Sequence, residues 1–534
     1  MRLPCKMPMP TRRGIACNDT FRHAWGVQKE HIDVTEPTNR IRLLKKLALP
    51  IAIAASLSAC VSGGASTSAG AGSQSSSNGV PTSNSANGAA TPITGSTIPM
   101  SQALNTPGSG TGQTIYVSTT GSNSNNGLSP QTPLQTIQQA VDTVKPGGTI
   151  EVMGGTYAGG ITISNPGTAN AWITMEPYQN QAVVIDGGSA MNNIFFTNSG
   201  NAPSYWEIKG FTLRSALQYG VQIDTPDVKI VDNNIYYTDY SIVKLVSTAH
   251  NIVIWGNQLH DNNHASAQAY VSKAVDMVGA VNVLVAHNNV YNISDIGLYC
   301  KGNATDITFA DNTLNNIGSR GIMLGQSTGV QFLQPGKTYE SYNSIIKNNV
   351  ITNDQSACLS ESSSYDAEIY NNSCYNAAIA HHGAIFISNE SAIQQAGTNV
   401  YIRNNIIEDS SSLPMVVIAP HAMTNYATLH INHNMYYDPA GVTFEWDDKN
   451  IYNMPFNTWQ QTTGLELNSV VENPQYADVT PVGAVMPSVT GNTLLSLSPS
   501  SPAINAGVVL PSVTHDINGT ARPSTGSYDM GAYQ

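Results

Sequence analysis

Short runs of alternating apolar and polar residues recur through the middle of the chain, and each run ends in an asparagine. The runs VKIVDNN, NIVIWGN, NVLVAHNN, DITFADN and VYIRNN share this form. An alternation with a period of two is typical of β-strands that bury one face. The asparagines that end the runs lie 23 to 37 residues apart; they are Asn234, Asn257, Asn289, Asn312, Asn349, Asn372, Asn405 and Asn434.

This spacing, with a minimum of 23 residues and insertions above it, predicts a solenoid in which each coil repeats one small unit. A coil of that length has room for three short strands and no helix, which favours an all-β fold, a single-stranded parallel β-helix. Asparagine tolerates a left-handed backbone and can bond to its neighbour in the next coil, so we expect an asparagine ladder at one corner. Gly210 is expected to fill the same corner one coil earlier.

The two ends of the solenoid carry different patterns. Apolar residues at helical spacing between 136 and 144 predict a cap helix that covers the N-terminal coil. The asparagine ladder stops before residue 441. We therefore expect the β-helix to span 113–440 and an irregular region, 441–534, to pack against its C-terminal end.

The first 112 residues are predicted to lie outside this domain. The apolar run LALPIAIAASLSAC follows a basic stretch and is too short to cross a bilayer. Its end, Leu-Ser-Ala-Cys, resembles the bacterial lipobox, so we interpret residues 1–60 as a leader with a lipoprotein-type signal and Cys60 as the lipidation site. An ordinary secretory signal is the alternative. Residues 61–112 are rich in Ser, Gly and Asn and predict a flexible linker. The expected location is the cell envelope, as an outer-membrane lipoprotein that is periplasmic or surface-exposed.

Composition narrows the range of partners. Charged residues make up only 11% of the chain, the net charge is −12 and the pI is about 5.4. No basic tract is available to displace counterions, so nucleic acid is excluded as a partner. We expect a monomer that touches the membrane only through its lipid. Cys300, Cys358 and Cys374 are an odd set without close spacing, which is a poor framework for disulfides. Cys300 and Cys358 fall at strand positions that should point inward, so we expect these two to be buried free thiols.

Both ends of the domain carry longer motifs. The opening segment reads YVSTTGSNSNNGLSPQTPLQTIQQAV and then KPGGTIEVMGGTY, and the closing segments are SPAINAG at 501–507 and DINGTARPSTGSYDMGAYQ at 516–534. These segments resemble right-handed parallel β-helix proteins of the pectate lyase-like superfamily, such as the secreted family nine pectate lyases. The resemblance implies the fold and a carbohydrate partner, while lyases and binding proteins share these end motifs.

Counting back from the asparagines places several polar residues on one outer face. Lys244, Asp276 and Tyr299 share one offset, and Lys301 and Glu361 share another. Coils stack about 4.8 Å apart, so Lys244, Asp276, Lys301 and Glu361 are predicted to form one column. Inserted segments, one of which carries His381 and His382, are expected to wall a groove beside it. The predicted substrate-binding residues are Lys244, Asp276, Tyr299, Glu361 and His381.

A groove with cations and carboxylates on its floor suits β-elimination on a uronate-containing polymer. The reaction needs a cation for the carboxylate, a base for the C5 proton and a donor for the leaving oxygen. We predict Lys301, Arg320 and His382 as catalytic residues. The pair Lys301 and Arg320 is similar to the Lys and Arg of the chondroitinase B and alginate lyase family of β-helix enzymes.

Other readings of the same face remain open. Asp276, Asp295 and Glu361 could supply oxygen ligands to calcium, although only Asp295 stands near Lys301 in sequence. Paired carboxylates would instead suit a glycoside hydrolase; the candidates are Glu361 and the pair formed by Asp366 and Glu368. An epimerase would take the same C5 proton. The rival from another class is a non-catalytic glycan-binding or adhesin-like surface lipoprotein. His260 and His264 are interpreted as loop residues.

Overall fold

The computed structural model describes residues 94–197, 204–262, 272–390, 395–479 and 491–534. The predicted leader, Cys60, most of the predicted linker and His264 lie outside these residues. None of the helices formed by the described residues combines the length and the apolar character that a bilayer crossing requires.

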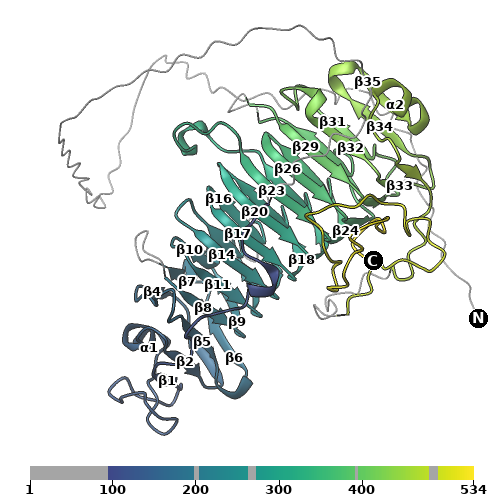
Figure 1. Cartoon of the computed structure of the whole chain (residues 1–534). Coiled ribbons are helices and arrows are strands. Elements are labelled where there is room, and N and C mark those ends of the chain that lie inside the picture. Colours follow the sequence, from purple (N-terminus) through teal and green to yellow (C-terminus); the bar gives the residue numbers. More distant parts are fainter. Residues whose placement is uncertain (1–93, 198–203, 263–271, 391–394, 480–490) are drawn as a thin grey trace, which may run out of the picture. The chain divides into compact units, whose positions relative to one another are not determined.

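The described chain winds into coils that build three long sheets, A, B and C, of twelve strands each (Figure 1). Every neighbouring pair is parallel except β34 and β35, as expected for a solenoid in which each coil adds one strand to each sheet. Sheet A contains β1 (Thr114–Val117), β2 (Thr149–Val152), β5 (Ile173–Pro177), β8 (Trp206–Lys209), β11 (Val228–Val231), β14 (His250–Trp255), β17 (Val281–Ala286), β20 (Ala304–Ala310), β23 (Ser341–Lys347), β26 (Ser364–Tyr370), β29 (Thr398–Arg403) and β32 (Leu429–Asn432).

Sheets B and C follow sheet A in each coil. Sheet B contains β3 (Gly155–Ala158), β6 (Val183–Asp186), β9 (Thr212–Ala216), β12 (Asn234–Thr238), β15 (Gln258–His260), β18 (Asn289–Ile293), β21 (Thr313–Ile317), β24 (Val350–Asp354), β27 (Ser373–Tyr375), β30 (Ile406–Glu408), β33 (Met435–Tyr437) and β36 (Val470–Val471). Sheet C contains β4 (Ile161–Ile163), β7 (Asn193–Thr197), β10 (Tyr219–Ile223), β13 (Val243–Leu245), β16 (Val275–Val278), β19 (Leu298–Lys301), β22 (Ile322–Gly325), β25 (Leu359–Ser362), β28 (Ile385–Ser388), β31 (Val416–Ile418), β34 (Thr443–Trp446) and β35 (Ile451–Pro455). Strands β34 and β36 extend the sheets beyond the predicted boundary at 440.

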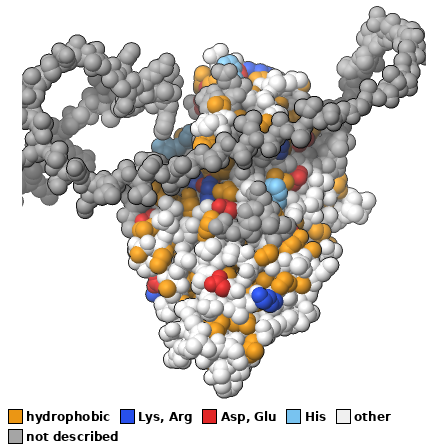
Figure 2. All heavy atoms as spheres, turned by 90° about the vertical axis from the view of Figure 1, so that its left-hand side faces the viewer, with side chains coloured by type: hydrophobic (Ala, Val, Ile, Leu, Met, Phe, Trp, Pro, Cys, Tyr) orange, Lys and Arg blue, Asp and Glu red, His pale blue; other side chains and the backbone are white. Residues whose placement is uncertain are grey.

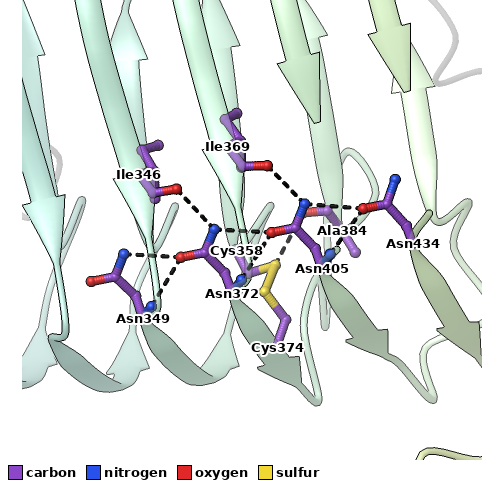
Figure 3. The surroundings of a disulfide bond; sticks show 9 residues. All are labelled: Ile346, Asn349, Cys358, Ile369, Asn372, Cys374, Ala384, Asn405 and Asn434. Atoms are coloured by element: carbon purple, nitrogen blue, oxygen red, sulfur yellow. Dashed lines mark hydrogen bonds between the residues drawn. A yellow bond between two sulfur atoms is a disulfide. The ribbon is translucent and has the colours of Figure 1, made fainter. Parts of the chain in front are cut away.

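The predicted ladder exists at the corner between sheets A and B, but two of its members were placed one residue too late. Its rungs are Asn233, Asn257, Asn288, Asn312, Asn349, Asn372, Asn405 and Asn434. In each rung except the last, Asn434, the backbone N–H and the side-chain Nδ2 donate to Oδ1 of the next rung at 2.9 to 3.2 Å (Figure 3). Asn234 and Asn289 instead begin β12 and β18.

Two rungs were placed one residue too late because the residue with the left-handed backbone and the asparagine that forms the rung are different positions in each coil. The residue before each rung is left-handed, as at Asp232 (φ 51°) and His287 (φ 56°). Gly210 has φ 80° and occupies that left-handed position, where glycine adds no steric cost. Phe211 occupies the rung position of its coil, and its N–H donates to Asn233 Oδ1 at 3.0 Å.

Short helices cover both ends of the core. The predicted cap helix is present as α1 (Ile137–Thr143), which buries Ile137, Ala140 and Val141 and is capped by the Thr136 side chain. At the other end, α2 (Phe456–Thr463) buries Trp459. The remaining helical turns of the described chain are 3-10 segments: η1 (Met100–Gln102), η2 (Tyr178–Asn180), η4 (Val330–Phe332), η5 (Tyr426–Thr428) and η6 (Asp447–Lys449).

The end of the predicted linker is bound to sheet A rather than free. Residues 94–107, named here the strap, place Ile98, Met100 and Ala103 in an apolar cluster with side chains of β14 and β17. Polar contacts fix the strap further: Ser96 N donates to Thr308 Oγ1 (2.8 Å) and Thr97 N to Asn282 Oδ1 (2.8 Å). The prediction of a flexible linker is therefore wrong for this part of 61–112.

The prediction of a buried free thiol is confirmed for Cys300 and wrong for Cys358. Cys300 is free and buried, whereas Cys358 and Cys374 form a disulfide (Figure 3). Their Cα atoms lie 6.4 Å apart, within the range that a disulfide spans. Both side chains are fully buried, and the bond links the start of β25 to β27 in the next coil. An odd count without close spacing did not reveal a pair that only the coil register brings together.

Candidate functional site

The predicted column forms on the outer face of sheet C. Lys244 of β13 pairs in register with Asp276 of β16, and Asp276 pairs with Tyr299 of β19. Lys301 lies two residues further along β19, opposite Val278 of β16. Because side chains alternate along a strand, Tyr299 and Lys301 share the outer face while Cys300 between them is buried in the core.

Two ion pairs bring the charged side chains of this face together. Lys244 Nζ lies 2.7 Å from Asp276 Oδ2, and Lys273 Nζ lies 2.7 Å from Asp295 Oδ2. All four side chains are only 12 to 15% exposed, so solvent screens these charges weakly. Burial alone would raise the pKa of Asp276, but Lys244, Lys301 and Lys273 together hold that pKa below its ordinary value.

Tyr299 lies between two of the lysines. The Nζ atoms of Lys301 and Lys273 lie 5.1 and 6.0 Å from the centre of the Tyr299 ring, within range for cation–π attraction. The Tyr299 hydroxyl donates to the backbone oxygen of Gln326. Burial raises the pKa of this phenol well above its ordinary value, so Tyr299 stays neutral.

The surroundings of Lys301 lower the pKa of its amine. Burial lowers its pKa most, and the nearby Lys244 and Lys273 lower it further, against the attraction of Asp276. Its Nζ donates to Ser327 O at 3.2 Å. Ser327 belongs to residues 326–340, named here the arm, which join β22 to β23.

Arg320 and His382 belong to coils that are separated by the coil of β25, and both side chains contact Phe386. Arg320 is 9% exposed; its Nη1 donates to Gln326 Oε1, and its guanidinium lies 5.1 Å from the ring centre of Phe386. The His382 ring contacts the same Phe386 at 4.6 Å between centroids. Burial, Arg320 and His381 lower the pKa of His382 to about 4. His382 is therefore neutral at neutral pH.

His381 completes this group. Its ring centre lies 6.3 Å from that of His382, and both residues precede β28 in the turn that leads from sheet B to sheet C. His382 Nδ1 and Ser356 Oγ lie 3.0 Å apart, which orients the His382 ring. The structure thus places Lys244, Asp276, Asp295, Tyr299, Lys301, Arg320, His381 and His382 on the sheet C side of successive coils, from the coil of β13 to the coil of β28.

Glu361 was predicted on the outer face and is instead inside the core. It is fully buried, and Oε1 accepts from Ser364 N at 2.7 Å. Burial raises its pKa to about 8. The offset failed because two residues, 302–303, separate β19 from β20, whereas Ser363 alone separates β25 from β26. A shift of one residue moves a strand side chain to the opposite face.

The other candidate carboxylates and histidine lie on different sheets. Asp366 accepts from Asn399 Nδ2 (2.8 Å) and Glu368 from Ser512 Oγ (2.8 Å), both on sheet A. His260 is stacked between two tyrosine rings on sheet B, at 4.9 and 4.5 Å between centroids. None of these three belongs to the sheet C cluster.

The predicted calcium ligands do not form a cation site. Asp276 and Asp295 each have an oxygen in a short ion pair with a lysine, and Glu361 is inside the core. Within the described parts of the chain, no group of three or more His, Cys, Asp or Glu side chains could hold a metal ion. The donor set therefore does not fit calcium.

Sequence reasoning missed three residues that complete the cluster. Lys273 pairs with Asp295, Gln326 bonds to both Tyr299 and Arg320, and Glu340 accepts hydrogen bonds from Gly302 N (2.8 Å) and Thr328 N (3.0 Å). All three lie in or beside insertions between coils, where the ladder offset gives no position. For Lys273 a signal was present, since it stands three residues before the correctly placed Asp276.

The charged cluster on sheet C contrasts with the rest of the chain, which carries few charges. Only 11% of the residues are charged, and Figure 2 shows a face on which a few basic and acidic side chains lie close together around the middle, among mostly uncharged ones. Two hollows of the described structure lie elsewhere. One, of about 380 Å³, adjoins the strap, and the other, of about 580 Å³, adjoins α1 and β3.

Comparisons with known proteins agree with this architecture. The family described as a right-handed β-helix region matches residues 192–335. The pectate lyase PEL9 of Emericella nidulans is 44% identical over 75 residues, which are 14% of this chain and 18% of the relative. The uncharacterised protein YwoF of Bacillus subtilis is 35% identical over 83 residues, 16% of this chain and 18% of the relative. Each match thus spans less than a fifth of the curated relative's length.

Two solved structures overlay most of the chain. The pectate lyase Pel9A has a TM-score of 0.52 at 15% identity, over 79% of this chain and 96% of the other. XylC, solved in complex with xylose, has a TM-score of 0.51 at 11% identity, over 79% and 98%. At these identities the likeness establishes the fold. With its three parallel sheets and its matched β-helix region, this chain is a right-handed parallel β-helix protein of the pectate lyase-like fold.

Proposed function

We propose that this protein is a carbohydrate-active enzyme, a polysaccharide lyase that cleaves a uronate-containing polymer by β-elimination on the outer face of sheet C. The observation that carries the proposal is the gathering of Lys244, Lys273 and Lys301 around Asp276 and Tyr299, with Arg320 nearby. The chain as a whole carries a net charge of −12, so long-range attraction of a polyanion is weak and a local cationic site is needed.

In the proposed reaction, the neutral amine of Lys301 takes the C5 proton of a bound uronate. The electron pair of the C5–H bond forms the C4=C5 double bond, and the C4–O4 bond to the leaving sugar breaks. The leaving oxygen then receives a proton from water or from the Lys301 ammonium. The lowered pKa of Lys301 supports this role, because a larger fraction of the amine is unprotonated near neutral pH than for an ordinary lysine.

Arg320 is the cation best suited to the uronate carboxylate. Lys244 and Lys273 are each committed to a carboxylate of the protein, whereas the Arg320 guanidinium donates to the neutral Gln326 side chain. A planar guanidinium can also bind a carboxylate through two parallel hydrogen bonds. Neutralising that carboxylate stabilises the negative charge that develops when C5 loses its proton.

The disulfide supports the proposed location. Disulfides persist in oxidising compartments and are rare in the cytosol. A Cys358–Cys374 bond therefore agrees with export, which the lipobox-like sequence before Cys60 predicts. We propose that the protein resides in the cell envelope and that a lipid on Cys60 is its membrane contact.

A glycoside hydrolase is the second candidate, favoured by one observation. Burial raises the pKa of Asp295, while the three lysines lower that of Asp276. Two carboxyl groups with separated pKa values are the arrangement that hydrolases use for an acid and a base. The ion pairs with Lys273 and Lys244 count against it, because each carboxyl group already has a partner.

One assay separates these functions. The full-length protein is incubated with polygalacturonate, alginate, glycosaminoglycans and neutral xylan, and two products are followed: the ultraviolet absorbance of the C4=C5 bond and new reducing ends. A lyase produces both, a hydrolase only reducing ends, and a binding protein neither. We expect Lys301→Ala to reduce elimination by at least about a thousandfold.

The matched control is Lys145→Ala, which removes the same charge at an exposed site after α1. This variant should retain the activity of the parent protein. Retention of unsaturated product by Lys301→Ala would exclude Lys301 as the base, and reducing ends without unsaturated product would replace the lyase by the hydrolase.

A further inference from the structure

The arm (326–340) starts at the proposed site and is fixed to the body of the solenoid. Its first residues bond to the cluster: Gln326 O accepts from the Tyr299 hydroxyl and Ser327 O from Lys301 Nζ. At its far end, the buried Glu340 binds back to Thr328 through Oε1 and Oε2 at 3.0 and 2.6 Å. These contacts close the arm into a loop of defined shape.

A second anchor holds the middle of the arm. Asn303 Oδ1 accepts from Gln334 N (2.5 Å), and Asn303 Nδ2 donates to Tyr339 O (2.6 Å). Asn303 itself is fully buried in the turn after β19. The arm is thus held in position by polar contacts, although its own apolar residues are not buried.

The arm presents apolar side chains to solvent. Phe332 is 65% exposed and Val330 58%, the two highest values among the large hydrophobic residues of the described chain. Both belong to η4. Single exposed hydrophobic residues are ordinary, but a fixed loop that exposes two neighbouring ones is typical of a binding surface.

Three tyrosines form a cluster at the end of the arm, and one of them, Tyr339, belongs to the arm itself. The ring centres of Tyr339, Tyr342 and Tyr365 are 5.2 to 6.1 Å apart. Tyr365 is 37% exposed, and the Tyr339 hydroxyl lies 3.1 Å from Thr398 Oγ1. Lys337 Nζ lies 5.0 Å from the Tyr342 ring centre and donates to Thr305 Oγ1 (2.9 Å). The surface therefore combines aromatic rings with hydroxyl and amine groups.

We propose that the arm and this tyrosine cluster form a second contact surface for the polysaccharide, which binds sugar units outside the cleaved linkage by stacking them on Phe332 and Tyr365. The inference rests on the proposed function for the identity of the polymer. Sugar rings have apolar C–H faces and polar rims, which match aromatic rings surrounded by hydroxyl groups. The arm is also continuous with the proposed site, because its first residues bond to Tyr299 and Lys301. A polymer bound at the site can therefore extend onto the arm.

The chain segment that precedes the strap is the alternative occupant. Thr94 N donates to Asn343 Oδ1 (3.1 Å), and Asn343 follows Tyr342 in the chain, so the first described residue lies close to the cluster. Residues 61–93 contain no aromatic and no charged residue, however, and have little with which to match the rings. The polysaccharide is therefore favoured.

The test measures binding without cleavage. Full-length Lys301→Ala protein is run in native gels that contain polygalacturonate, alginate or hyaluronan, and its retardation gives an apparent Kd. Adding Phe332→Ala or Tyr365→Ala should raise that Kd about threefold to tenfold for a retarding polymer. Tyr452→Ala, which removes a 49% exposed tyrosine from β35, should leave it unchanged. Unchanged unfolding midpoints will show that each variant is folded.

Two results would overturn the inference: retardation that Phe332→Ala leaves at the parent value, or no retardation by any of the three polymers. Tighter polymer binding by a chain that begins at Thr94, with no effect of Phe332→Ala, would assign the surface to the preceding segment. Retardation that depends on Phe332, in a protein that yields no unsaturated product, would overturn the lyase proposal and leave this one standing.

Discussion

The properties of Lys301 come from its neighbours in other coils. Lys244 and Lys273 lie 57 and 28 residues earlier in the chain, yet both lower the pKa of Lys301. Asp276 acts in the opposite direction but is already paired with Lys244 at 2.7 Å. The acidity of this lysine is therefore a property of the stacked coils and not of the local sequence DIGLYCKGN.

The pH dependence of elimination should report this coupling. The neutral amine is the base, so kcat/KM rises with pH until Lys301 has lost its proton. Lys244→Gln removes a cation that lowers the pKa of Lys301 and leaves Asp276, which raises it, without its partner. We expect the rising limb of the profile to move to higher pH in Lys244→Gln and to stay in place in the exposed control Lys145→Gln. A profile of Lys244→Gln that stays in place, or moves to lower pH, would show that Lys244 does not lower the pKa of the catalytic base.

At the scale of single residues, the sequence predicted the outward positions of Lys244, Asp276 and Tyr299 because strand alternation is a local rule. It failed at Glu361 because the face of that residue depends on the length of a turn, and the turn after β25 is one residue shorter than the turn after β19. Turn length is decided by how each coil closes on the next, which no local pattern records.

Among the elements, the asparagine ladder is held by a continuous series of buried hydrogen bonds. The Asn312 side chain takes part in four hydrogen bonds: Oδ1 accepts from N and Nδ2 of Asn288, and Nδ2 donates to Val285 O and Asn349 Oδ1. All four hydrogen bonds are buried. A backbone or side-chain group that loses its bond to Asn312 therefore cannot bond to solvent water instead. The repeat made the ladder visible in the sequence, and the doubled asparagines at 233–234 and 288–289 hid which of the two is the rung.

Replacement of a rung should be costly. An unsatisfied buried polar group costs about 1 to 3 kcal/mol, and part of that is recovered by relaxation, so we expect Asn312→Ala to lower the free energy of unfolding by about 3 to 5 kcal/mol. Asn316→Ala is the control, because the Asn316 side chain is exposed and its Nδ2 donates to Asn292 Oδ1 (2.8 Å) at the surface. Its expected cost is about 1 to 2 kcal/mol, because alanine has to adopt the left-handed backbone of Asn316 (φ 56°). Equal costs in urea titrations of the two variants would show that the ladder adds no stability.

For the whole molecule, the repeat was sufficient to predict the fold, because each coil forms the same local contacts with its neighbours. Segments without a repeat were not predictable in the same way. The strap belongs by composition to a Ser/Gly-rich tract, and only Ile98, Met100 and Ala103 distinguish it. The disulfide and Lys273 likewise depend on which coils become neighbours.

The strap contacts strands that are remote from it in sequence, so its contribution to stability can be measured by removing it. It covers Val253, Leu284 and Ala286 on sheet A, and Asn105 O accepts a hydrogen bond from the buried Lys229. A chain that begins at residue 108 would leave that apolar patch and Lys229 uncovered. We expect such a chain to lose about 2 to 5 kcal/mol of unfolding free energy and to self-associate, because exposed apolar side chains cost about 1.5 to 3 kcal/mol each when large. A chain that begins at Thr94 keeps the strap and should match the full-length protein in urea titration and show no self-association on gel filtration. If both truncated chains behave alike, the strap contributes nothing to the stability of the β-helix, and the composition-based prediction of a flexible linker would apply to its energetics after all.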